Sequence, residues 1–191
     1  MDIIGFHGYG ATGAGEQILS QLQTVRQVAA SHGYSNVPIW NTEGSWGQSI
    51  NPTTDTLAWQ ANFLAREYIL SASAGIARYI WYGWDYHARW GTLWNNGTLP
   101  AGQAYGTVYN WLVGATFTTP CAKINGSAWR CELSRPGGYS AQILWTDDDS
   151  NQNYQVSDSF VRRRDLITNS ASPIQGGTVS IGPRPILIES N

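Results

Sequence analysis

Three strand-like apolar runs, each followed by a helix-like segment, place the strongest constraint on what this chain can fold into. The runs cover 3–9, 37–42 and 77–85, and the amphipathic segments cover 16–31, 54–73 and 103–113. Helical segments between strands are typical of the right-handed crossovers that join parallel neighbours. The sequence therefore predicts an α/β region with a parallel sheet over residues 1–117.

The pattern of apolar and turn-forming residues changes after residue 117. Short alternating runs separated by Gly, Pro, Asn and Asp clusters follow, over 128–133, 140–145, 155–160, 161–166, 178–181 and 185–189. Such spacing indicates a small antiparallel β module. We therefore expect two domains, 1–117 and 118–191.

Composition narrows the classes of function. Of the 191 residues, 42% are hydrophobic and 13% are charged, so the chain can bury a core. The net charge of −2 gives no electrostatic reason to expect nucleic acid or an anionic membrane as a partner. No apolar stretch reaches transmembrane length. The chain has ten Trp and ten Tyr but only four Phe. This excess favours a hydrated, carbohydrate-binding surface, and a Trp-rich core is the alternative.

The two cysteines, Cys121 and Cys131, lie ten residues apart on either side of the turn dipeptide Asn125-Gly126. This spacing suits a disulfide between neighbouring strands, and two cysteines without accompanying histidines make a poor zinc site, so no metal is expected. A disulfide would indicate an oxidising, extracytoplasmic compartment. Met1 leads directly into a strand-like run with no signal peptide, which we interpret as a mature form or a fragment.

Glu43 follows the second apolar run, between Trp40 and Trp46. In parallel α/β folds, reactive groups gather in the crevice outside the carboxyl ends of the strands. A carboxylate flanked by flat aromatic rings suits a sugar site, because it offers one group for the anomeric carbon and faces for the apolar side of the ring. The alternative is an ordinary turn acid that caps the next helix.

Three motifs resemble the last three strands of a retaining (β/α)8-barrel glycoside hydrolase, in the clan of cellulases, xylanases, β-xylosidases and β-glucosidases. They are Asp2-Ile-Ile-Gly-Phe-His7-Gly-Tyr9, Pro38-Ile-Trp-Asn-Thr-Glu43-Gly-Ser-Trp46 and Tyr79-Ile-Trp81-Tyr-Gly-Trp84-Asp85. The tail, with Arg135-Pro-Gly-Gly-Tyr139, is similar to the β-sandwich appended to many members. The resemblance implies an α/β partial (β/α)8 barrel of three βα units, followed by a small antiparallel β-sandwich.

By this resemblance, Glu43 is the catalytic nucleophile, and no cofactor is expected. His7 and Tyr9 would hydrogen-bond Glu43 or the sugar, unless His7 is a buried core histidine. Trp46 would line the site, and Trp81 or Trp84 would stack on the sugar, although core packing of one of these two is an equal alternative. Asp85 would be a partner of the site residues or a solvated loop acid.

The chain departs from the family pattern in one respect. The family acid/base is a Glu after Asn at the end of the fourth strand, and this sequence has no Asn-Glu dipeptide and nothing resembling strands one to five. The second carboxylate is therefore expected to be absent or supplied by another chain. Three parallel strands alone would leave two open edges, so we expect a homo-oligomer.

The leading hypothesis is a retaining glycoside hydrolase or a truncated relative, acting on β-linked plant-wall glycans or aryl glycosides, outside the cell or in the periplasm. Its rival is a non-catalytic carbohydrate-binding or scaffold protein. A serine esterase is a minor alternative: His7 and Asp85 are present, but the surroundings of Ser45 lack the Gly-x-Ser-x-Gly pattern.

Overall fold

The computed structural model describes residues 1–10, 15–46, 54–85 and 90–190, apart from the side chains of residues 54 and 55. The chain forms two compact units, Met1–Gly102 and Gln103–Asn191. The expected domain boundary near residue 117 stays a prediction; the first strand of the second unit begins at Thr116. Of the loops expected from the sequence, Asn51-Pro52 lies outside the described residues, and those at 10–15 and 86–97 lie partly outside them.

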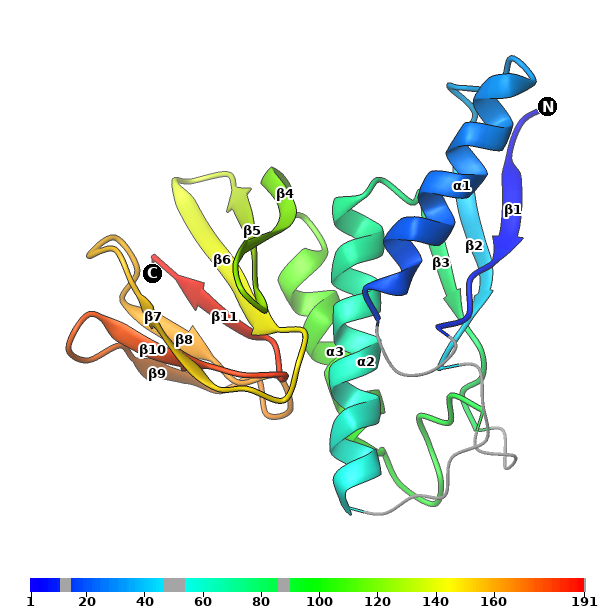
Figure 1. Cartoon of the computed structure of the whole chain (residues 1–191). Helices are drawn as coiled ribbons and strands as arrows, with labels where there is room; N and C mark the ends of the chain where they lie inside the picture. The colour runs from blue at the N-terminus through cyan, green and yellow to red at the C-terminus, as the bar shows by residue number, and fades with distance from the viewer. Residues whose placement is uncertain (11–14, 47–53, 86–89, 191) are drawn as a thin grey trace. The chain divides into compact units, whose positions relative to one another are not determined.

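The first unit contains a three-stranded sheet in the order β1-β2-β3 (Figure 1). Its strands are β1 (Ile4–His7), β2 (Ile39–Gly44) and β3 (Arg78–Trp81), and both pairings are parallel. Helix α1 (Gln17–Ser31) follows β1 and helix α2 (Thr54–Ser73) follows β2. The parallel α/β arrangement expected from the alternation of runs is therefore confirmed for this unit.

Local chemistry explains where these elements end. Gly33 follows α1 with φ +81°, a conformation that favours glycine, and the Tyr34 N–H donates to the Ala29 carbonyl at 2.8 Å to close the last turn. Strand β3 is shorter than the expected run of 77–85. After Tyr82, the chain leaves the sheet, because the Gly83 N–H donates to the Trp90 carbonyl at 3.1 Å rather than to β2.

An aromatic cluster forms much of the core of the first unit. The fully buried Trp46 ring lies 5.3 Å from the ring of Trp81 and 6.3–6.4 Å from those of Trp59 and Phe63. Aliphatic side chains of the two helices complete the buried set, including Ile18, Leu22, Leu64, Ile69 and Leu70. Part of the unusual Trp content is therefore structural.

The second unit is mainly antiparallel. Helix α3 (Pro100–Leu112) leads into a six-stranded sheet of order β4-β5-β6-β11-β8-β9 and a two-stranded sheet of β10 and β7. The strands are β4 (Thr116–Asn125), β5 (Ala128–Arg135), β6 (Tyr139–Thr146), β7 (Gln152–Gln155), β8 (Arg162–Arg164), β9 (Ala171–Pro173), β10 (Thr178–Ile181) and β11 (Ile186–Glu189). Strands β4 and β9 were not predicted, because threonines, cysteine and prolines interrupt their alternation. The run expected at 155–160 was wrong beyond Gln155, because β7 ends there and a turn follows.

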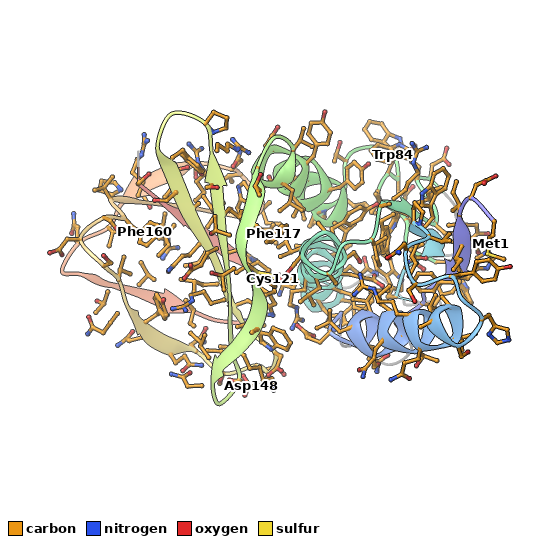
Figure 2. All side chains as sticks on the ribbon, turned by 90° about the horizontal axis from the view of Figure 1, so that it is seen from above. Met1, Trp84, Phe117, Cys121, Asp148 and Phe160 are labelled. Carbon is orange, nitrogen blue, oxygen red and sulfur yellow. A yellow bond between two sulfur atoms is a disulfide. The ribbon has the colours of Figure 1, made fainter. Side chains whose placement is uncertain are left out.

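The core of the second unit lies between its two sheets. Leu144 and Ile188 from the large sheet pack with Val179 and Ile181 from β10. The predicted disulfide between Cys121 and Cys131 is present and joins the neighbouring strands β4 and β5 (Figure 2). Within the described residues, no helix has the length and apolar character needed to cross a membrane.

Candidate active site

The carboxyl ends of β1 and β2 bring the candidate residues together. His7, the last residue of β1, is paired with Glu43 in the register of the two parallel strands. The register shifts between Phe6 and His7, and again between Asn41 and Gly44 where β2 meets β3. Because parallel strands end at the same edge of a sheet, these irregularities lie where a parallel α/β fold presents its reactive groups.

The Glu43 carboxylate is held by two side chains. The Tyr9 hydroxyl donates a short hydrogen bond to Oε1, and His7 Nδ1 lies 3.4 Å from Oε2. The Glu43 side chain is 31% exposed and that of His7 is 59% exposed, so His7 is not a buried core histidine. Burial, together with the hydrogen bond to Glu43, raises the pKa of the Tyr9 phenol above its ordinary value. Tyr9 therefore stays a hydrogen-bond donor to the carboxylate.

Asn41 is a site residue that the sequence reasoning missed. Its buried side chain accepts hydrogen bonds from the Gly8 N–H at 2.9 Å and from the Glu43 N–H at 3.4 Å. The same side chain donates to the Gly8 carbonyl at 3.4 Å. An Asn two residues before Glu43 carries no recognisable signal in one sequence, because only the fold brings Gly8 next to it.

Exposed aromatic side chains lie on the segment that follows β3. Trp84, labelled in Figure 2, is 53% exposed, and Tyr82 and Trp94 are also exposed. The Trp94 N–H donates to the Trp84 carbonyl at 2.9 Å, which places the backbones of these two tryptophans side by side. The Trp90 ring meets the Tyr9 ring edge-on, with centroids 6.0 Å apart. These rings provide flat, wet surface of the kind that stacks on sugars.

Trp46 and Trp81 pack in the core of the first unit. This corrects the expectation that Trp46 lines the site, and for Trp81 it matches the core-packing alternative that the sequence left open. Trp46 is fully buried. Trp81 is partly buried, stacks on Tyr68 with centroids 6.1 Å apart, and donates its indole N–H to the Gly91 carbonyl at 2.5 Å. Their faces are occupied by protein, so of the predicted tryptophans Trp84 alone has an exposed ring.

The exposure of the other candidate residues also differs from one to the next. Asp85 is exposed beside Trp84, next to residues outside the described range, and its role as a partner stays a prediction. Ser45 is fully buried, so its hydroxyl is not accessible to an ester substrate. Among the described residues, no three His, Cys, Asp or Glu side chains group as a metal site would require.

Glu67 on α2 and Tyr79 on β3 bring two buried side-chain oxygens close together. Glu67 Oε2 and Tyr79 Oη are both buried and have no hydrogen-bond partner among the described residues. Burial raises the pKa of both groups well above their ordinary values; the nearby Tyr79 hydroxyl opposes the rise for Glu67, while Glu67 adds to the rise for Tyr79. The two groups therefore lie close without an aligned hydrogen bond, and burial favours the neutral form of each.

Several solved structures of glycoside hydrolases resemble this chain. A family 39 glycoside hydrolase from Bacteroides cellulosilyticus WH2 matches 98% of this chain and 44% of its own, with 17% identity and a TM-score of 0.72. A 4-O-α-L-rhamnosyl-β-D-glucuronidase from Fusarium oxysporum 12S matches 98% of this chain and 52% of its own, with 12% identity and a TM-score of 0.66. A GH51 arabinofuranosidase from Xanthomonas axonopodis pv. citri matches 100% of this chain and 53% of its own, with 12% identity and a TM-score of 0.60.

These matches concern the fold. The chain spans about half the length of the structures it matches, and at such low identity the likeness carries the fold and not the residues. No protein-family model matches the sequence. Comparison with curated proteins also gives no match.

Proposed function

We propose that the first unit carries the nucleophile side of a retaining glycoside hydrolase site, with Glu43 as the nucleophile. The observation that supports this most is the environment of Glu43. Its carboxylate lies at the carboxyl end of a parallel strand, open to solvent, and is oriented by Tyr9 and His7. The substrates proposed are β-linked plant-wall glycans or aryl glycosides.

The chemistry follows from that geometry. One oxygen of Glu43 forms a bond with the anomeric carbon while the glycosidic carbon–oxygen bond breaks and the leaving oxygen takes a proton from a general acid. Water then attacks the glycosyl ester and restores the free carboxylate. The Tyr9 hydroxyl, hydrogen-bonded to Oε1, would hold the carboxylate in place before attack. Trp84 would stack on the apolar face of a sugar ring.

The general acid is proposed to come from another chain. Retaining hydrolysis needs a second carboxyl group roughly 5–5.5 Å from the first. Within the described part of the chain, the side-chain contacts of Glu43 are with Tyr9 and His7. Strands β1 and β3 each have one neighbour in the sheet, and the side chains of Ile3, next to β1, and Ile80, within β3, are exposed. We propose that a second copy covers this sheet; a monomer by light scattering at all concentrations would argue against it.

A second candidate is a carbohydrate-binding protein without turnover. The exposed surface of Trp84, Tyr82 and Trp94 favours it, because stacking on sugars needs no general acid. The disulfide and the glycoside hydrolase neighbours are compatible with an extracellular or periplasmic protein under either proposal.

One experiment separates the two candidates. Activated aryl β-glycosides would be offered to the wild type, to Glu43→Gln, and to Glu132→Gln as a control that makes the same change on β5. We expect phenol release by the wild type and the control and none by Glu43→Gln, and a 2-deoxy-2-fluoro glycoside should label Glu43 covalently. Equal release by all three proteins would refute the nucleophile assignment. Quenching of Trp fluorescence by xylo- or cello-oligosaccharides without turnover would favour the binding protein.

A further inference from the structure

The ends of β1 and β2 are held together by more than regular sheet pairing. The register between the two strands shifts between Phe6 and His7, just before the residues that contact Glu43. Past this shift, the Gly8 N–H donates to the Glu43 carbonyl at 3.0 Å. An irregular strand end needs additional contacts to adopt a single conformation, because the ladder no longer satisfies each backbone group in turn.

The Asn41 amide supplies these contacts. Its oxygen accepts from the N–H groups of both Gly8 and Glu43, at 2.9 and 3.4 Å, and its nitrogen donates to the Gly8 carbonyl at 3.4 Å. Asn41 has no exposed surface, so water is not available to replace these bonds. The Asn41 side chain thus links the backbone of Gly8, which lies between His7 and Tyr9, to the backbone of Glu43.

The two glycines leave the space that the amide occupies. A Cβ atom on Gly8 would come within 2.7 Å of Asn41 Nδ2. A Cβ atom on Gly44 would come within 2.8 Å of the same nitrogen, within 2.7 Å of the Gly8 carbonyl oxygen, and against the Tyr79 hydroxyl. Larger residues at either position would therefore displace the Asn41 side chain.

We propose that Asn41 is the positioning residue of the Glu43 site: its amide ties Gly8 to the Glu43 backbone and so holds Tyr9 and His7 against the carboxylate. Asn41 acts through these residues and does not touch a substrate. The catalytic consequence rests on the proposed function, whereas the structural claim stands without it. A side chain lacking the amide would remove the three Asn41 hydrogen bonds and leave backbone bonds such as Gly8 N–H to the Glu43 carbonyl to hold the irregular strand ends.

The first test measures the contact between Tyr9 and Glu43 through the pKa of the Tyr9 hydroxyl. Tyrosines labelled at the ring carbon that carries the hydroxyl would be titrated by NMR, with the Tyr9 resonance assigned from Tyr9→Phe. Burial raises the pKa of Tyr9 most and contact with Glu43 adds to the rise, so Glu43→Gln should lower its midpoint part of the way. Asn41→Ala should move the midpoint toward that of Glu43→Gln, and the milder Asn41→Ser should move it part of the way. Asn62→Ala, which removes another buried Asn from the same unit, should leave it unchanged.

The second test uses aryl glycoside kinetics. If the wild type turns over, Asn41→Ala should lower kcat about 10²-fold with little change in KM, because a displaced nucleophile loses alignment while the sugar surface remains. A wild type without turnover would refute the proposed function and leave the titration to decide on Asn41. A Tyr9 midpoint equal to that of the wild type in Asn41→Ala, or in Asn41→Ser if the alanine variant does not fold, would overturn the inference.

Discussion

Glu43 on β2 and Glu189 on β11 each accept a hydrogen bond from a tyrosine, but one carboxylate is open to solvent and the other is covered by protein. Glu43 accepts a hydrogen bond from Tyr9, and Glu189 accepts one from Tyr139 at 2.9 Å. The Glu189 side chain is only 3% exposed, and its Oε1 lies 2.9 Å from Arg164 Nε and 3.7 Å from Arg162 Nε. Glu43 is ten times as exposed, and within the described residues neither arginine nor lysine contacts it.

The difference shows what separates a structural carboxylate from an available one. Arginines neutralise Glu189 and protein covers almost all of its side chain, so little of the carboxylate is open to a ligand. Glu43 is oriented by a neutral phenol and an imidazole and keeps one side open. Glu67 forms an intermediate case, because it is buried like Glu189 but contacts no cation among the described residues. Substitutions at these three carboxyl groups therefore test the comparison.

The largest effect is expected at Glu189. Glu189→Gln would leave Arg162 and Arg164 without their counter-ion and should lower the free energy of unfolding by about 2–3 kcal/mol, less than a fully buried pair because both arginines are partly exposed. Glu43→Gln should change it by less than about 0.5 kcal/mol. Urea denaturation of both variants measures the difference. Similar losses would show that Glu43 is as structural as Glu189.

A smaller change in the free energy of unfolding, in the stabilising direction, is expected at Glu67. The pKa of Glu67 in the folded protein lies above the pKa of an ordinary Glu. The contribution of neutral Glu67 to folding stability is therefore complete below the ordinary pKa and is lost as pH rises through the folded-state pKa. Glu67→Gln keeps the shape without the charge and should stabilise the protein at neutral pH by roughly 1–2 kcal/mol. The two proteins should converge in acid. Thermal unfolding across acid to neutral pH checks this, and parallel curves would show that Glu67 has an unrecognised cationic partner.

Smaller losses of stability than at Glu189 are expected at the two tyrosines that contact Glu43 and Glu189. Tyr139→Phe should cost about 1 kcal/mol by removing a part-buried hydrogen bond to the well-covered Glu189 carboxylate. Burial and Glu189 raise the pKa of Tyr139 to about 12, so this stability is complete below its ordinary pKa of 10.0 and is lost as pH rises towards 12. The difference between Tyr139→Phe and the wild type should therefore vanish in strong alkali.

Tyr9→Phe provides the matched change in the first unit. It should cost less at neutral pH, because the Glu43 side chain is 31% exposed and that of Glu189 only 3%, so water replaces more of the lost hydrogen bond at Glu43. Chemical denaturation of the two phenylalanine variants at neutral and alkaline pH gives both values. A larger cost at Tyr9 than at Tyr139 would contradict the contrast between the two carboxylates.

Much of the fold could be predicted from local patterns. The parallel order of the first strands, the C-terminal glycine of α1 and the Cys121–Cys131 disulfide all follow from short-range signals, and they are present. The candidate site was only partly predictable. The approach of His7 and Tyr9 to Glu43 follows from strands that end at one edge, but the sequence does not distinguish an exposed tryptophan from a buried one. Trp46, three residues from Glu43, lies in the core, whereas Trp84 is exposed.

By itself, the sequence determined the periodicity of the elements, the turn chemistry and the position of a carboxylate at the end of a strand, because these depend on neighbours along the chain. The tertiary structure alone decided which carboxylate is open and which is neutralised, and that Asn41 meets Gly8. Burial and charge pairing depend on residues that are distant in sequence, as Glu189 is from Arg164 and Asn41 is from Gly8. Glu43 owes its availability to that long-range arrangement.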